Sequence, residues 1–445
     1  MATSAESGNP SPFWVRAYVL TVMITLPMDW FQPTATLLRE LGGKPAILVL
    51  MAGAVCGLLS RAKIPATRLE LSAVALLAAL LSLGFGAALI NFILGWSGWL
   101  RTRDPSVQLA SQALMIVAAG MALLGNARLA RIYPIADLAG RYLLPATLFH
   151  FCIFGLEAAK VISDSAGPLT LFRAQEGDVI ERPTGLFSEP SYFGVFAALY
   201  GSGLLVQSVP TAGRRFVQRV LPIVLYASAV LIGAKTLVAA AGVQAVYFVM
   251  RQTRSIRTKV LGVVAVAIVS AGGVVFIQIH SGFDVQANLS SAVRLGSTVL
   301  ASNVAMAGYA LPGIGIGQFH FFYRTEFAPN FIYASIEAIQ QLSSDADNRA
   351  STYNFYIRVL IELGVFGLVM LLFGLRKLWQ SDLPASMKHI QLLFAGSLGF
   401  LMTQDTYFYP PLVFAAALIM SHAHAHAQTG PQTATAARLT REPAT

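Results

Sequence analysis

The sequence predicts an all-α fold, a polytopic membrane helical bundle that crosses the bilayer about a dozen times. Of the 445 residues, 56% are hydrophobic and 12% are charged, whereas a soluble domain carries roughly 25% charged residues. The apolar residues also form long blocks, and Leu71–Leu94 and Val260–Ile279 contain no charged residue. A helix needs about 20 such residues to cross the hydrocarbon core. This composition excludes an ordinary soluble domain.

Apolar blocks set the predicted spans. In chain order they cover residues 13–31, 45–60, 71–94, 108–126, 142–159, 190–209, 219–233, 236–250, 260–279, 354–373, 389–403 and 411–425. The first block follows the polar segment Met1–Pro12, which has no basic region, so we expect a retained helix and not a signal peptide. Cys56 and Cys152 lie inside apolar blocks and are interpreted as small core residues, not as a disulfide.

Most of the apolar blocks are separated by short polar turns. Lys235 divides two of them, and Asp405 divides the last two. Between the ninth and tenth blocks the chain is polar over about residues 280–353, and a second long connection covers 160–189. Long loops of this kind commonly carry function. Residues 1–425 are therefore predicted to form one membrane domain, and residues 426–445 a disordered tail.

The basic residues indicate the orientation of the bundle. The net charge of +10 does not require nucleic acid, because lysine and arginine gather in alternate short loops, as they do on the cytoplasmic side of membrane proteins. These residues are Arg61, Lys63, Arg68, Arg128, Arg131, Arg141, Arg214, Arg215, Arg219, Arg251, Arg254, Arg257, Lys259, Arg376, Lys377, Lys388, Arg438 and Arg441. Both termini are therefore predicted to be cytoplasmic, with the two long loops outside.

The first outside loop ends in a polar segment, Arg182-Pro-Thr-Gly-Leu-Phe-Ser-Glu189, directly before Pro190. Proline suits the first turn of a helix, and Ser188 is the expected N-cap. Glu189 and Arg182 would then lie at the outer surface, where a helix N-terminus favours an anion. The alternative is that Arg182 is a surface anchor. Lys235 has a similar pair of interpretations, as a functional charge at membrane depth or as a snorkelling turn residue.

The second outside loop contains Arg294, then Ala310-Leu-Pro-Gly-Ile-Gly-Ile-Gly-Gln-Phe, then Arg324. Alternate glycines allow a close approach of the backbone to a ligand or a helix. Asp345 and Asp347 suit either a divalent cation or a solvated surface. Beyond the loop, Asn354, Arg358 and Glu362 are each four residues apart and share one helical face. That face is expected to meet a cavity, or to form an ion pair between helices.

Together these segments resemble the superfamily of O-antigen polymerases and O-antigen ligases. The similarity covers Arg182 to Phe193, Arg294 with Leu311 to Phe319, and Tyr353 to Gly367. It implies a GT-C-like glycosyltransferase of the bacterial inner membrane with a large periplasmic loop. It also implies a glycan linked to undecaprenyl diphosphate as substrate, membrane lipid around the protein, and no metal or other cofactor. A chain-length regulator and a flippase are candidate partners.

The resemblance also assigns candidate site residues. Arginine suits a diphosphate leaving group, because the guanidinium forks onto phosphate and keeps its proton. Arg182 and Arg294 are therefore assigned to the diphosphate and Glu189 to the general base. The further candidates for substrate binding are Lys235, Gln318, Arg324, Tyr353, Asn354, Arg358 and Glu362.

One departure bears on the choice of reaction. The ligases of this superfamily carry histidine where this sequence has Tyr353, which favours a polymerase for O-antigen or exopolysaccharide. A ligase that transfers glycan to lipid A–core, a transporter of lipid-linked sugars, and a membrane scaffold or acyltransferase remain alternatives. No internal repeat of the transporter kind is found in the sequence.

Overall fold

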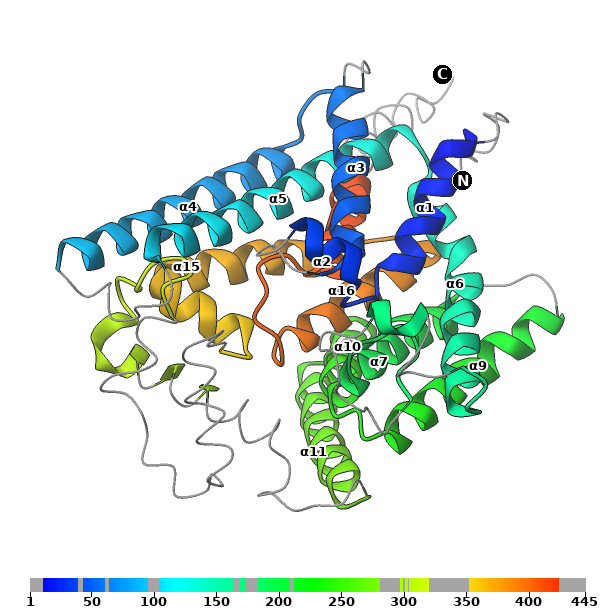
Figure 1. The fold of residues 1–445 in the computed structure, drawn as a ribbon. Helices are drawn as coiled ribbons and strands as arrows, with labels where there is room; N and C mark the ends of the chain where they lie inside the picture. Colours follow the sequence, from blue (N-terminus) through cyan, green and yellow to red (C-terminus); the bar gives the residue numbers. More distant parts are fainter. Residues whose placement is uncertain are drawn as a thin grey trace, which may run out of the picture.

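The computed structural model describes residues 11–38, 43–60, 64–94, 104–162, 168–172, 183–207, 212–253, 255–280, 297–298, 301–302, 304–319 and 352–423. These residues form a bundle of helices (Figure 1), as predicted. The main helices are α1 Phe13–Thr25, α2 Gln32–Leu38, α3 Pro45–Leu59, α4 Arg68–Ile93, α5 Pro105–Ile132, α6 Ile135–Ala158, α7 Pro190–Phe196, α8 Ser202–Val206, α9 Ala212–Leu231, α10 Thr236–Gln252, α11 Ile256–His280, α15 Phe355–Trp379, α16 Lys388–Phe400 and a C-terminal helix Pro410–Ala423.

Every predicted span coincides with a helix, and α7 and α8 make one span through the π-helical turn η3, Ala197–Gly201. Within the described residues, five helices are long and apolar enough to cross a membrane: α4, α5, α6, α11 and α15. Side chains that would be costly in water also lie on the surface: Val269 of α11 is 74% exposed. Apolar surface of this extent belongs against lipid.

Local signals explain where several helices begin and end. Thr67 and Glu70 form a capping box that starts α4, and Asp104 caps α5 ahead of Pro105. The predicted first span, 13–31, is too long, because α1 ends at Thr25, just before Pro27. Leu26 keeps helical backbone angles, but Pro27 after it has no N–H group to continue the helical hydrogen bonds. Asp29 therefore lies in the connection between α1 and α2, outside the span.

Small residues allow the helices to approach closely. A side chain at Gly57 of α3 would meet the carbonyl oxygen of Gly125 in α5 at 2.0 Å. Such contacts between small residues are the usual way for helices to pack in lipid. The prediction that both cysteines are core residues is wrong: Cys56 and Cys152 are free, as expected, but exposed on the apolar outer surface.

The bundle has two distinct ends. Trp14 near the start of α1 packs on Tyr133, with 5.3 Å between the ring centroids. Met420 of the C-terminal helix packs beside Leu69 and Leu378. Arg131, near Tyr133, pairs with Glu70, next to Leu69, at 2.6 Å. The first described helix therefore begins, and the last one ends, at the same end of the bundle. The opposite end carries the connections around Asp29 and Ser188, which contact each other, and we call it the mouth end.

The second long loop is not wholly outside the bundle. Ile314 and Ile316 are fully buried, and the side-chain amide of Asn91 in α4 donates to the carbonyl of Ile314 at 2.7 Å. This segment, Leu311–Phe319, is a strap between α4, α5 and α15. The strap enters a break in α15, where Gly364 has φ 72° and the N–H groups of Ile314 and Gly315 donate to carbonyls freed by the break.

Candidate functional site

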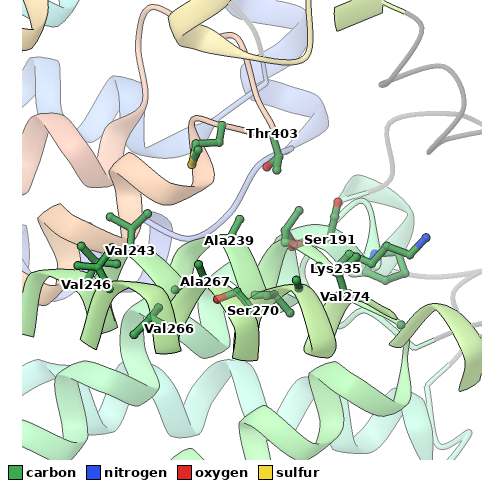
Figure 2. Close-up of a pocket in the computed structure, with 18 of the residues that line it drawn as sticks. Ser191, Lys235, Ala239, Val243, Val246, Val266, Ala267, Ser270, Val274 and Thr403 are labelled. Atoms are coloured by element: carbon green, nitrogen blue, oxygen red, sulfur yellow. The ribbon is translucent and has the colours of Figure 1, made fainter. Parts of the chain in front are cut away.

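A groove of about 830 Å³ runs between α10 and α11, and we call it the α10–α11 groove. Its walls are formed mainly by small apolar side chains, which include Val243 and Val246 of α10 and Val266 and Val274 of α11. A side chain at Gly242 would meet the Ser270 hydroxyl at 2.9 Å, so the two helices nearly touch below the groove. Figure 2 shows Val246 at one end and Lys235 at the other.

The length of the groove follows from helix geometry. Thr236 and Val246 are ten residues apart, so the groove runs for about 15 Å along α10. The hydrocarbon core of a bilayer is about 30 Å thick, so this is the depth of one leaflet. The shape therefore suits one long apolar chain that enters from lipid.

Apart from the Ser270 hydroxyl of α11, the polar residues that line the groove lie at its mouth end. Glu189, Ser191, Lys235, Thr236 and Thr403 line it there, and Figure 2 shows Ser191 and Lys235 close together. The Ser191 hydroxyl donates to Glu189 Oε2 at 2.9 Å. A lysine and a glutamate thus line the groove at the point where an apolar chain would end.

Two helices begin at this mouth, because α7 starts at Pro190 and α10 at Thr236. They are held together there by the Thr236 hydroxyl, which donates to the Ser191 carbonyl. Helix N-termini carry partial positive charge and unpaired N–H groups, which favour phosphate. Together with Lys235 they make the mouth suited to an anion.

A second polar cluster lies beside the groove. Residues 401–409 connect α16 to the C-terminal helix, and Thr403 of this connection lines the groove. Two residues further on, the Asp405 carbonyl accepts a hydrogen bond from Arg358 Nη1 at 2.5 Å. The same short connection therefore borders the groove and an arginine of α15.

We name these residues the Arg358 cluster: Arg358, Glu362, Asp405, Tyr407 and Gln112. Arg358 Nε pairs with Glu362 Oε1 at 3.2 Å, and Nη2 donates to Gln112 of α5 at 3.0 Å. The Tyr407 hydroxyl donates to the other oxygen of Glu362 at 2.5 Å, and the Tyr407 ring lies 4.6 Å from the guanidinium. The cluster joins α5, α15 and the 401–409 connection, and Glu362 is 1% exposed.

The structure therefore places the sequence-predicted site residues in several different surroundings. Glu189 and Lys235 both line the groove, whereas Arg358 and Glu362 form the expected ion pair inside the bundle. Asn354 caps α15 through the N–H groups of Tyr356 and Ile357, and Tyr353 precedes it with φ 49°. Gln318 is buried in the strap and donates to the Pro105 carbonyl at 3.2 Å. Arg182, Arg294 and Arg324 lie outside the described residues, as do Asp345 and Asp347.

The predicted N-cap of α7 is wrong. Glu189 occupies the cap position, but its side chain makes no capping hydrogen bond to the N–H groups of the helix, and the Ser188 hydroxyl bonds instead to Asp29. The reason is tertiary, since a buried carboxylate from the α1–α2 connection competes for this hydroxyl.

Sequence reasoning missed several polar residues at the mouth end, namely Asp29, Lys44, Gln112, Asp405 and Tyr407. Burial lowers the pKa of Lys44, and the carboxylates of Asp29 and Asp405 oppose that change. Lys44 thus connects Asp29 electrostatically to the Arg358 cluster. The available signal was the run Gln404-Asp405-Thr406-Tyr407, which interrupts two apolar blocks.

Comparison with known proteins adds no family at this point: no protein-family model matches the chain, and no curated protein matches it either. Among the described residues, no group of three or more His, Cys, Asp or Glu side chains is placed to hold a metal ion.

Proposed function

We propose that the protein is a polymerase of a bacterial envelope polysaccharide, an O-antigen or an exopolysaccharide. It joins repeat units linked to undecaprenyl diphosphate at the periplasmic face of the inner membrane, with both termini in the cytoplasm. One observation carries the proposal: the α10–α11 groove is apolar for the depth of one leaflet and ends in Lys235, Glu189 and two helix N-termini. An isoprenoid chain with a diphosphate head has the same division into apolar tail and anionic end.

The reaction would follow from this placement. A hydroxyl oxygen of the acceptor glycan attacks the anomeric carbon of the donor sugar and forms the new glycosidic bond. The bond from that carbon to the diphosphate oxygen breaks, and undecaprenyl diphosphate leaves with the electron pair. Glu189 takes the hydroxyl proton. Lys235 and the helix N-termini stabilise the charge that develops on the leaving diphosphate.

The sequence resemblance and the groove support the same chemistry from different residues. Arg182 and Arg294 are proposed to contact the diphosphate together with Lys235. The Arg358 cluster is proposed to hold the acceptor side of the site through the 401–409 connection, because its charges are already paired. Asn354, Tyr353, Gln318 and Arg324 are proposed as nearby contacts.

Purified protein tests this proposal with a lipid-linked repeat unit as the substrate. Wild-type protein should convert it into a ladder of longer lipid-linked glycans. Lys235→Ala should raise the Kd for the lipid substrate about tenfold or more, because an ion-paired phosphate contact is lost, and Lys235→Arg should retain binding. The matched control is Lys377→Ala, since Lys377 borders a second apolar groove between α4 and α15.

Each alternative gives a different result in cells. Loss of a polymerase should leave single repeat units on the lipid carrier or on lipid A–core. Loss of a ligase should leave long chains on the undecaprenyl carrier, and loss of a transporter should leave repeat units on the cytoplasmic side. Either of the last two results would overturn the polymerase assignment.

A further inference from the structure

Asp29 is a buried carboxylate that the proposed chemistry does not use. It lies in the connection between α1 and α2 and is 8% exposed. Its Oδ1 accepts a hydrogen bond from the Ser188 N–H at 3.0 Å, and its Oδ2 accepts one from the Ser188 hydroxyl. A carboxylate that receives both donors of one residue fixes that residue in position and orientation. We call this pair the Asp29 clamp.

Ser188 is the residue directly before Glu189, which lines the mouth of the α10–α11 groove. The turn before it is held at a second point, because Glu157 Oε2 of α6 accepts from the Thr184 N–H at 2.8 Å and from the Gly185 N–H. The backbone that carries Glu189 is thus fastened on one side to α6 and on the other to the α1–α2 connection. Of these two attachments, the Asp29 clamp is the one at the residue next to Glu189.

The surroundings of Asp29 set the pKa of its carboxyl group. The pKa of Asp29 is raised to about 6, because burial and, to a smaller extent, the charge of Glu189 outweigh the hydrogen bonds from Ser188, which lower it. Lys44, which precedes α3, and Tyr409, which precedes the C-terminal helix, are the other ionisable groups coupled to it. A carboxylate kept in so apolar a place costs free energy unless it is well paired. Its retention beside Glu189 suggests a task at the site.

We infer that Asp29 is a positioning residue, which holds Glu189 at the mouth of the groove through the backbone and hydroxyl of Ser188. The inference rests on the proposed function, since it presumes that Glu189 accepts the proton of the attacking hydroxyl. It predicts that the clamp affects turnover more than binding of the lipid. A misplaced base slows the chemical step, whereas Lys235 and the groove still bind the substrate.

The test uses Asp29→Asn and Ser188→Ala in the full chain, with the chain-elongation assay and a melting curve for each protein. Both variants should lower kcat about tenfold or more with the KM for the lipid substrate within about twofold. Ser188→Ala keeps the charge of Asp29 and removes only the hydroxyl, so it guards against a variant that fails to fold. Glu157→Gln is the matched control for loosening the same turn away from Glu189, and it should change kcat less.

The pH profile supplies a second readout. Asp29 is ionised above about pH 6 and takes up a proton below it, so wild-type kcat should fall as the pH is lowered through that region. Asparagine does not titrate, so the acidic limb of the Asp29→Asn profile should move to lower pH. A purely structural residue would change the amount of active protein and leave the shape of this profile unchanged.

The outcomes separate the two claims. If wild-type protein elongates glycans but both variants keep the wild-type kcat and pH profile, the clamp is wrong and the proposed function stands. If both variants lose kcat only in proportion to folded protein, the clamp is also wrong. If wild-type protein does not elongate glycans, the proposed function fails, and this inference fails with it.

Discussion

Charged residues of this protein have two different environments. Arg358 has its donors occupied by Glu362, Gln112 and the Asp405 carbonyl, so its charge is balanced within the bundle. Lys235 is half-buried and borders an open groove. A charge at membrane depth is costly and is retained for pairing or for function. We interpret Arg358 mainly as a link between helices and Lys235 as a contact for substrate.

The buried ion pair between Arg358 and Glu362 predicts a large loss of stability when its carboxylate is removed. Glu362→Gln removes the anion that Arg358 contacts at 3.2 Å and should lower the free energy of unfolding by about 3 kcal/mol or more, because it leaves a buried cation partly unpaired. Asp382→Asn is the control, since Asp382 pairs with Arg251 while its own side chain is 96% exposed. That exposed pair should contribute less than about 1 kcal/mol.

Denaturant unfolding in detergent micelles measures both values. Equal losses for Glu362→Gln and Asp382→Asn would contradict the structural interpretation of the Arg358 cluster. The i, i+4 pairing itself could be predicted from sequence, because it depends on residues of one helix. The contacts to Gln112 and Asp405 could not, since they depend on how α5 and the 401–409 connection pack against α15.

The positions of the helices could be predicted from the local sequence, whereas the break in α15 depends on a contact with another segment. Hydropathy is a local property, and it located a helix at each predicted span. The break in α15 escaped prediction, because Glu362-Leu-Gly364 lies in the middle of the predicted span 354–373, which no proline interrupts. The helix breaks there because another segment, the Leu311–Phe319 strap, supplies donors to the freed carbonyls. The glycines were predicted to allow a close approach to a ligand or to a helix, and in the structure they permit a close approach to α15 and α4.

The contact between the strap and α15 predicts that a side chain at Gly313 destabilises the protein. Gly313 has φ +76°, and a side chain there would meet the Glu362 carbonyl oxygen at 2.7 Å. Gly313→Ala should therefore lower stability by about 1–3 kcal/mol from backbone strain alone, with the clash in addition. Gly86→Ala in α4 is the control, because its added Cβ would have no atom within 4 Å.

A melting curve of each purified protein compares the two substitutions. We expect a lower melting temperature and a lower folded yield for Gly313→Ala, and an unchanged or slightly higher melting temperature for Gly86→Ala, since alanine is the better helix former. If Gly313→Ala melts with the wild type, the strap does not hold the break in α15 as described.

The whole molecule combines an apolar outer surface with one polar mouth. Val269 of α11 is 74% exposed, whereas Val266 of the same helix lines the α10–α11 groove. The sequence predicted a helical membrane protein, and it singled out Glu189 and Lys235, which line the same groove. It could not predict the groove, because α11 is apolar on all sides and its sequence does not distinguish the groove from the surface that faces lipid.

Photo-cross-linking tests the central claim most directly. A photoreactive amino acid at Val266 reports on the groove, and one at Val269 reports on the exposed face of the same helix. With a radiolabelled glycan on undecaprenyl diphosphate in excess phospholipid, Val266 should capture the labelled lipid far more than Val269, and Lys235→Ala should remove that difference. Equal capture at the two positions, with or without Lys235, would contradict a lipid-diphosphate site between α10 and α11.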